Sequence, residues 1–173
     1  FSSFPIEKRH FLLFVSSQWT ERKGAKLISE IIKNIDQKLD IVIIGKWKTK
    51  KPNIKSCRFI EKRLSKAELN SYYKNAICLV NPTLEDNFPT VNIEAQCCGT
   101  PVIAFDSGGT KETIFTNHSR IVARGDCFQM ANEINNLIKE KVANDINEKT
   151  SYFDSKRMAD DYFKLYLEVL KND

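Results

Sequence analysis

The chain has 173 residues, enough for one domain with a buried core. Apolar residues make up 42% and charged residues 28%, which is typical of a globular protein. No apolar run reaches the roughly 20 residues that a membrane span needs, which argues against an integral membrane protein.

Short apolar runs alternate with longer segments that have helical spacing. In the first part of the chain, residues 11–15, 41–44 and 57–60 predict three buried strands, the second of them ended by Gly45. Between the first two, residues 23–35 predict a helix. Its apolar face is formed by Leu27, Ile28, Ile31, Ile32 and Ile35.

The second part of the chain repeats this alternation. Ser65 and Glu68 have the spacing of a capping box and predict a helix over residues 65–75. A further helix is expected from about Thr90, which can cap it, to Cys98. Strands are predicted at 77–80, 101–105 and 120–123, and helices near 128–141 and 154–170.

Strand–helix alternation with almost continuously apolar strands predicts an α/β fold with a doubly wound, parallel, six-stranded, Rossmann-like sheet. In such folds, ligands bind beyond the carboxyl ends of the strands. The segments expected there are 16–24, 81–90 and 106–113.

The five cysteines show no C-x-x-C spacing. The adjacent Cys97 and Cys98 are interpreted as small core residues in a reducing cytosol, with a redox or metal role as the alternative. No metal-ligand spacing, P-loop or dinucleotide fingerprint is present, so no metal or cofactor is expected.

Charge is unevenly distributed along the chain. Residues 1–66 carry 16 Lys and Arg against 6 Asp and Glu, whereas residues 67–173 carry 11 against 16. The densest cluster, Lys46–Lys51, is either a solvated loop or a contact for an anionic membrane surface, with Trp47 at the interface. Nucleic-acid binding is not expected, because the cluster lacks an aromatic-rich companion surface.

A basic pair, Arg22 and Lys23, precedes the small residues Gly24 and Ala25 at the expected start of a helix. The N–H groups and positive dipole end of a helix N-terminus favour anions, and Gly24 would let a phosphate come close. Basic residues are also common near helix starts for no functional reason, so the stretch alone leaves both interpretations open.

The two carboxylates of Asp86 and Glu94 lie eight positions apart, across the start of the helix expected at Thr90. Each can accept hydrogen bonds from a vicinal diol, and the N–H groups of Thr90 and Val91 could face an anion between them. The spacing fits a ligand with hydroxyls at both ends and phosphate in the middle, such as a nucleotide sugar. The alternative is a turn residue and a helix-surface residue without a ligand.

The segment "NPTLEDNFPTVNIEAQCCGTPVIAFDSGGTKE" resembles the signature region of the family-4 glycosyltransferases, which have the GT-B fold. The resemblance extends from "FLLFVSS" to the last helix. It implies that residues 1–173 form one domain, the donor-binding C-terminal half of a two-domain enzyme whose N-terminal, acceptor-binding half is absent. It also implies that residues 152–173 form a helix that crosses back to that half, its apolar face partly uncovered here.

The family motif E-x7-E falls on Asp86 and Glu94. By resemblance, Asp86 would hold hydroxyls of the transferred sugar, Glu94 the ribose diol and Lys23 the diphosphate. These three are the expected catalytic residues. The backbone around Phe88, Thr90 and Val91 would contact sugar and phosphate, and Leu64 would contact the base.

The chain departs from the family pattern at two places. Ser17 occupies the position of an arginine common in the family, and Arg22 is the candidate substitute. The G-F-G that often follows the first acid is replaced by Asn87–Phe88–Pro89, where Pro89 lacks an N–H and Asn87 could supply a side-chain donor. Such versions occur among bacterial surface-polysaccharide enzymes.

The resemblance implies metal-free transfer of a sugar, with retention of configuration, from a nucleotide sugar to an acceptor in surface-polysaccharide assembly. The expected location is cytoplasmic, peripheral to the inner face of the membrane if Lys46–Lys51 contacts lipid. Two alternatives remain open: a non-catalytic nucleotide-binding domain, and a nucleotide-sugar epimerase of GT-B-like fold.

Overall fold

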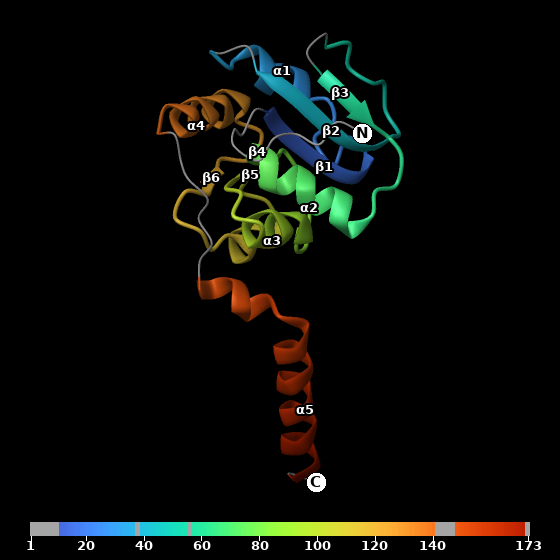
Figure 1. The fold of residues 1–173 in the computed structure, drawn as a ribbon, viewed down its shortest axis with the longest axis vertical. Coiled ribbons are helices and arrows are strands. Elements are labelled where there is room, and N and C mark those ends of the chain that lie inside the picture. The colour runs from blue at the N-terminus through green and yellow to red at the C-terminus, as the bar shows by residue number, and fades with distance from the viewer. Residues whose placement is uncertain (1–10, 37–38, 55–56, 141–147, 172–173) are drawn as a thin grey trace.

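The structure, a computed structural model, describes residues 11–36, 39–54, 57–140 and 148–171. Its centre is a six-stranded parallel sheet with the order β3-β2-β1-β4-β5-β6 (Figure 1). The strands are β1 (Phe11–Trp19), β2 (Asp40–Trp47), β3 (Cys57–Ile60), β4 (Ala76–Asn81), β5 (Val102–Phe105) and β6 (Arg120–Val122). The helices are α1 (Ile28–Lys33), α2 (Lys66–Asn75), α3 (Thr90–Cys97), α4 (Cys127–Glu140) and α5 (Ser155–Lys171), with 3-10 segments η1 (Gly108–Thr113) and η2 (Glu148–Phe153).

Both faces of the sheet are buried, which confirms the doubly wound fold. Successive residues of a strand point to opposite faces. Leu12 and Phe14 of β1 therefore join the core under α1 and α4, while Phe11 and Leu13 join the core under α2 and α3. Because each strand buries both faces, its sequence is continuously apolar rather than alternating.

In the strand order, β2 and β3 lie on one side of β1, and β4, β5 and β6 lie on the other, so the topological switch point is between β1 and β4. The crossovers leave these two strands on opposite sides, so a crevice is expected outside their carboxyl ends. That position organises the candidate site described below.

The helix predicted over residues 23–35 is wrong in its first part, because α1 begins only at Ile28 and ends at Lys33. Gly24 has φ +73°, a left-handed conformation that interrupts a helix. A Cβ at this glycine would lie 2.0 Å from the carbonyl oxygen of Pro82, so the backbone here packs directly on the segment after β4.

The second predicted strand also differs from the structure, since β2 continues through Gly45 to Trp47. The predicted capping box of α2 is confirmed: the Glu68 backbone N–H donates to the Ser65 hydroxyl (3.2 Å), and the Ser65 N–H donates to the Glu68 carboxylate (2.8 Å). The hydrogen bond from the Ser65 N–H and a second from Lys62 lower the pKa of Glu68 to about 2, so the carboxylate is ionised at neutral pH.

Two predictions about single residues are corrected. Trp47 does not project to an interface, because its ring stacks on Trp19 at 5.8 Å and lies against Phe59. Cys97 is not a core residue: it lies on the solvent side of α3, while the preceding Ala95 and Gln96 are buried. Cys98 is half-buried.

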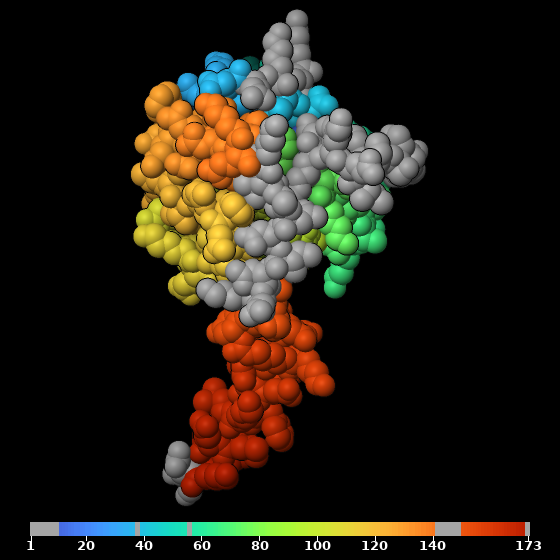
Figure 2. Space-filling view, turned by 60° about the vertical axis from the view of Figure 1, so that its left-hand side comes forward, coloured from blue at the N-terminus to red at the C-terminus, as the bar shows by residue number. Residues whose placement is uncertain are grey.

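The last helix, α5, agrees with the helix predicted near 154–170, and Tyr152 and Phe153 belong to the preceding η2. Residues 172 and 173 lie outside the described residues. No residue of α5 is buried, and the helix projects away from the rounded body of the molecule (Figure 2). Its exposed large apolar residues are Met158, Tyr162, Phe163, Leu165, Tyr166, Leu167, Val169 and Leu170. Within the described part of the chain, no helix combines the length and the hydropathy needed to cross a membrane.

Candidate functional site

A polar hollow of about 250 Å³ lies at the carboxyl ends of β1 and β4, where the sheet order predicts a crevice. It is formed by the end of β1, the turn after β1, the end of β4, the loop after β4 and the first turn of α3. The lining residues are Val15, Ser16, Ser17, Trp19, Lys23, Asn81, Asp86, Phe88, Pro89, Thr90 and Val91.

Lys23 and Asp86 form an ion pair inside this hollow. The Lys23 Nζ lies 2.5 Å from Asp86 Oδ2, and both side chains are mostly shielded, with 24% and 20% of their surfaces exposed. The other carboxylate oxygen, Oδ1, accepts a hydrogen bond from the Phe88 N–H at 3.3 Å. A cation and an anion from two different loops are thus brought to one place, 63 positions apart in sequence.

Several backbone hydrogen bonds hold the turn that carries Lys23. The N–H of Lys23 donates to the Thr20 carbonyl at 3.1 Å, and the Gly24 N–H donates to the Glu21 carbonyl at 2.9 Å. The Arg22 carbonyl accepts from the Leu84 N–H, which ties this turn to the loop after β4. The prediction that Gly24 sits at a helix N-terminus with free N–H groups is therefore wrong, and the charge of Lys23 is what this turn offers to an anion.

The helix N-terminus that does face the hollow is that of α3. Its N-cap is Pro89, and no side chain caps the helix. The prediction that Thr90 caps it is wrong, because Thr90 is already the first helical residue. The first N–H groups of a helix have no acceptor within the helix, and the first turn of α3 carries no acid that would repel an anion. Thr90 and Val91 therefore present anion-binding groups beside Lys23.

Gly108 and Gly109 hold the other side of the Asp86 loop. A Cβ at Gly108 would lie 1.9 Å from the Asp86 carbonyl oxygen, and one at Gly109 would lie 2.0 Å from that of Asn87. The Gly109 N–H donates to the Asp86 carbonyl at 3.3 Å. Only residues without a side chain permit this approach, so the glycine pair fixes the backbone that carries Asp86.

A buried polar network connects α3 to the segment that begins with this glycine pair. The fully buried Gln96 donates to the carbonyls of Asn92 (2.8 Å) and Thr113 (2.7 Å). Its carbonyl oxygen accepts from the N–H groups of Phe115 (2.9 Å) and Thr116 (3.1 Å). One side chain thereby ties α3 to the backbone of Thr113, Phe115 and Thr116.

Glu94, the second expected acid, does not line the hollow. It is exposed on α3, and its Oε2 accepts a hydrogen bond from the Tyr73 hydroxyl at 2.9 Å. Residues three and four positions apart lie on the same face of a helix, so Glu94 follows Thr90 and Val91 by one turn. The Glu94 carboxylate therefore lies about one helical turn beyond the hollow, on the same face of α3 as Thr90 and Val91.

The structure thus brings together six of the expected site residues, namely Ser17, Lys23, Asp86, Phe88, Thr90 and Val91. It leaves Arg22, Gly24, Leu64, Asn87 and Glu94 outside the lining of the hollow. Leu64 packs against the core beneath α2 and α3. Ser16 and Asn81 also line the hollow. Both fall within the segments predicted at the carboxyl ends of the strands, but neither was predicted as an individual site residue.

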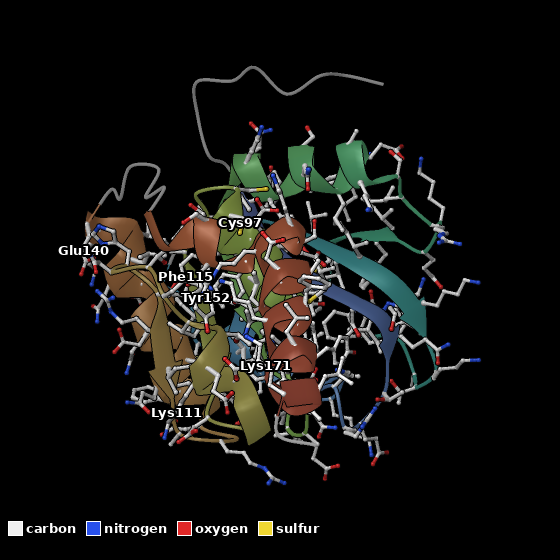
Figure 3. All side chains as sticks on the ribbon, turned by 90° about the horizontal axis from the view of Figure 1, so that it is seen from below. Cys97, Lys111, Phe115, Glu140, Tyr152 and Lys171 are labelled. Carbon is white, nitrogen blue, oxygen red and sulfur yellow. The ribbon has the colours of Figure 1, made fainter. Side chains whose placement is uncertain are left out.

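A second, more apolar hollow of about 540 Å³ lies between Phe88 and the start of α5. Its wall is reinforced by aromatic contacts: the ring centroid of Phe153 lies 5.0 Å from that of Phe115 and 5.3 Å from that of Tyr152. Figure 3, which views the molecule from below, labels Phe115 and Tyr152 at this junction. Phe88 is 44% exposed and borders both hollows.

No group of three or more His, Cys, Asp or Glu side chains with the arrangement of a metal site occurs among the residues that the structure describes. The charged groups in the polar hollow are Lys23 and Asp86, and they are paired with each other.

Comparison with known proteins points to one family. The chain matches the family described as "Glycosyl transferases group 1" over residues 9–140. A stretch of 58 residues is 45% identical to D-inositol 3-phosphate glycosyltransferase from Streptomyces bingchenggensis. The matched stretch covers 34% of this chain and 13% of that protein.

Solved structures share the fold over almost the whole chain. Sucrose-phosphate synthase from Thermosynechococcus elongatus aligns with a TM-score of 0.79 and 21% identity, covering 98% of this chain and 47% of that one. HepE from Anabaena, in complex with UDP, aligns with a TM-score of 0.72 and 16% identity, covering 97% of this chain and 50% of that one. At such identities the likeness establishes the fold alone, and the chain spans about half the length of either structure.

Proposed function

This chain belongs to the family of glycosyl transferases group 1, and from that premise we propose that it binds the donor, a nucleotide sugar, for an enzyme that transfers the sugar to an acceptor. One observation carries the proposal: Lys23 and the uncapped N-terminus of α3 converge on one hollow at the switch point of the sheet. A UDP complex is also the form in which the similar HepE was solved.

The diphosphate is proposed to lie between Lys23 and the first turn of α3. A full positive charge and a helix N-terminus on the same side of a partly shielded hollow favour a compact dianion. Asp86 pairs with Lys23 at 2.5 Å and so holds the ammonium group at the edge of this position. Its carboxylate keeps lone pairs for hydroxyl groups of the transferred sugar.

The proposed reaction is transfer with retention of configuration and without a metal. The bond between the anomeric carbon and the diphosphate oxygen breaks, and its electron pair stays on the diphosphate. The acceptor oxygen bonds to that carbon on the same face, and the proton of the acceptor hydroxyl passes to the departing diphosphate. Negative charge grows on the leaving group, where Lys23 and the α3 N–H groups are preorganised to stabilise it.

The other half of the enzyme is proposed to cover α5. The chain spans about half the length of the two similar structures. No residue of α5 is buried, and its apolar side chains continue into the hollow beside Phe88. An exposed apolar surface of this extent is typical of an interaction site. We propose that the absent acceptor-binding half packs on α5 and closes the site against water.

We further propose a role in bacterial surface-polysaccharide assembly, which the Asn87–Phe88–Pro89 version of the motif supports. The proposed location is cytoplasmic, at the inner face of a membrane. Lys46, Lys48 and Lys50 are exposed, as such a contact requires, whereas Trp47 is partly buried and stacks on Trp19. The attraction to anionic lipid would then be purely electrostatic.

Calorimetric titration of the chain with UDP, GDP and ADP tests the proposal. At least one nucleoside diphosphate is expected to bind, and its nucleoside without phosphate at least about tenfold more weakly, because the phosphates supply the main electrostatic contact. Affinity should fall as salt is added, since the hollow is partly exposed. Equal binding of nucleoside and diphosphate, or no binding of either, would contradict the proposed function.

A further inference from the structure

Tyr73 connects the core of the domain to the one expected acid that lies outside the hollow. The residue is on α2, is fully buried, and packs in the core beneath α2 and α3. Its hydroxyl donates to Glu94 Oε2 at 2.9 Å, although Glu94 is itself exposed. A rigid, buried donor thus holds one oxygen of a flexible surface carboxylate.

The position of Tyr73 is fixed at both ends. Its backbone carbonyl accepts hydrogen bonds from the Thr100 hydroxyl at 2.5 Å and from the Ala76 N–H, which joins α2 to the segment before β5 and to β4. Its ring is enclosed by apolar side chains. Burial, and then the negative charge of Glu94, raise the pKa of Tyr73, so the hydroxyl remains a donor over the physiological pH range.

This contact constrains Glu94 in a way that matters for a ligand. A free glutamate on a helix surface populates several rotamers, and ordering it on binding costs entropy. A carboxylate offers about four lone-pair positions, and the Tyr73 hydroxyl takes one of them on Oε2. The remaining positions are left, in a set orientation, for two neighbouring hydroxyl groups.

We propose that Tyr73 is a positioning residue that orients the Glu94 carboxylate toward the ribose hydroxyls of the donor nucleotide. The inference rests on the proposed function and on the ribose-binding role that the family resemblance implies for Glu94. It adds that recognition of ribose over 2′-deoxyribose depends on a buried side chain of α2 that never touches the nucleotide.

The test measures affinities of UDP, GDP and ADP and of their 2′-deoxy forms for the whole chain, by calorimetry. The variants are Tyr73→Phe, Glu94→Gln and the double variant, and Tyr72→Phe is the matched control. Tyr72 is the neighbouring tyrosine of α2, partly buried, with its ring edge-on to Phe11 at 6.3 Å. Glu94→Gln alters an exposed side chain and should leave the fold intact. It therefore tests the role of the carboxylate even if Tyr73→Phe destabilises the core.

In Tyr73→Phe, the preference for the ribonucleotide should fall by about threefold to tenfold, as expected when a hydrogen bond that orients a charged group is lost. Affinity for the 2′-deoxy form, which keeps only the 3′-hydroxyl as a donor to Glu94, should fall by a smaller factor. Glu94→Gln should also lower the preference, Tyr73→Phe should change nothing further in that background, and Tyr72→Phe should leave it intact.

The inference is overturned if Tyr73→Phe retains the full preference, weakens both nucleotide forms equally, or acts additively with Glu94→Gln. If the unmodified chain binds diphosphates but does not distinguish ribose from 2′-deoxyribose, this inference is overturned and the proposed function stands. Failure of every diphosphate to bind the unmodified chain would instead overturn the proposed function, and this inference with it.

Discussion

Replacing Lys23 with methionine is expected to weaken nucleoside diphosphate binding by about tenfold to a hundredfold. The substitution removes the cation and leaves the Asp86 carboxylate, formerly paired at 2.5 Å, facing the phosphates without a partner. Both side chains retain some exposure to water, which moderates the effect below that of a fully buried pair. The measurement is calorimetric titration with the tightest-binding of UDP, GDP and ADP.

The chain offers a matched control for this experiment. Lys26 lies in the same segment and also pairs with an acid, Glu21, at 2.5 Å, but both side chains are 68% exposed. Lys26→Met should change affinity by no more than about twofold, because exposed pairs contribute little. The double variant with Lys23→Met and Asp86→Asn should recover part of the lost affinity. Equal losses in Lys23→Met and Lys26→Met would exclude Lys23 from the phosphate site.

Replacing Gln96 with leucine is expected to lower the free energy of unfolding by about 3–5 kcal/mol. The leucine fills a similar volume but removes the hydrogen bonds that Gln96 makes with the N–H groups of Phe115 and Thr116 and with the Thr113 carbonyl. Each buried group left unsatisfied adds its own desolvation cost. Urea denaturation followed by circular dichroism measures the change.

Gln129→Leu is the reference for that experiment. Gln129 lies exposed on α4, and its side chain accepts a hydrogen bond from the exposed Ala123 N–H at 3.2 Å. The cost there should stay below about 1 kcal/mol. If Gln96→Leu costs no more than this variant, the network does not fix the segment that supports Asp86.

Local patterns in the sequence predicted the frame of the molecule well. The strand predicted over 57–60 has the same bounds in the structure, and the capping box of Ser65 and Glu68 forms as expected. These features depend on apolar runs and on residues three positions apart, so a single sequence contains the information. The parallel, doubly wound arrangement follows from the alternation of strands and helices.

The features that failed depend on contacts between distant residues. The predicted helix begins later than expected, because the backbone of Gly24 meets Pro82, which lies 58 positions later. Trp47 is partly buried, because its ring stacks on Trp19. The partner of Glu94, Tyr73, comes from another helix. No local periodicity encodes such pairings, so the sequence named the acids but not what orients them.

The central claim is that the hollow formed by the turn at Lys23, the Asp86 loop and the first turn of α3 holds the diphosphate of a nucleotide sugar. Heteronuclear NMR of the ¹⁵N-labelled chain, titrated with UDP, GDP and ADP and with their nucleosides, tests it most directly. We expect the diphosphates to shift the amide signals of Thr90, Val91 and Lys23 most, and the nucleosides to leave these signals nearly unchanged. Diphosphate-induced shifts confined to another face of the molecule, with these three amides unaffected, would contradict the claim.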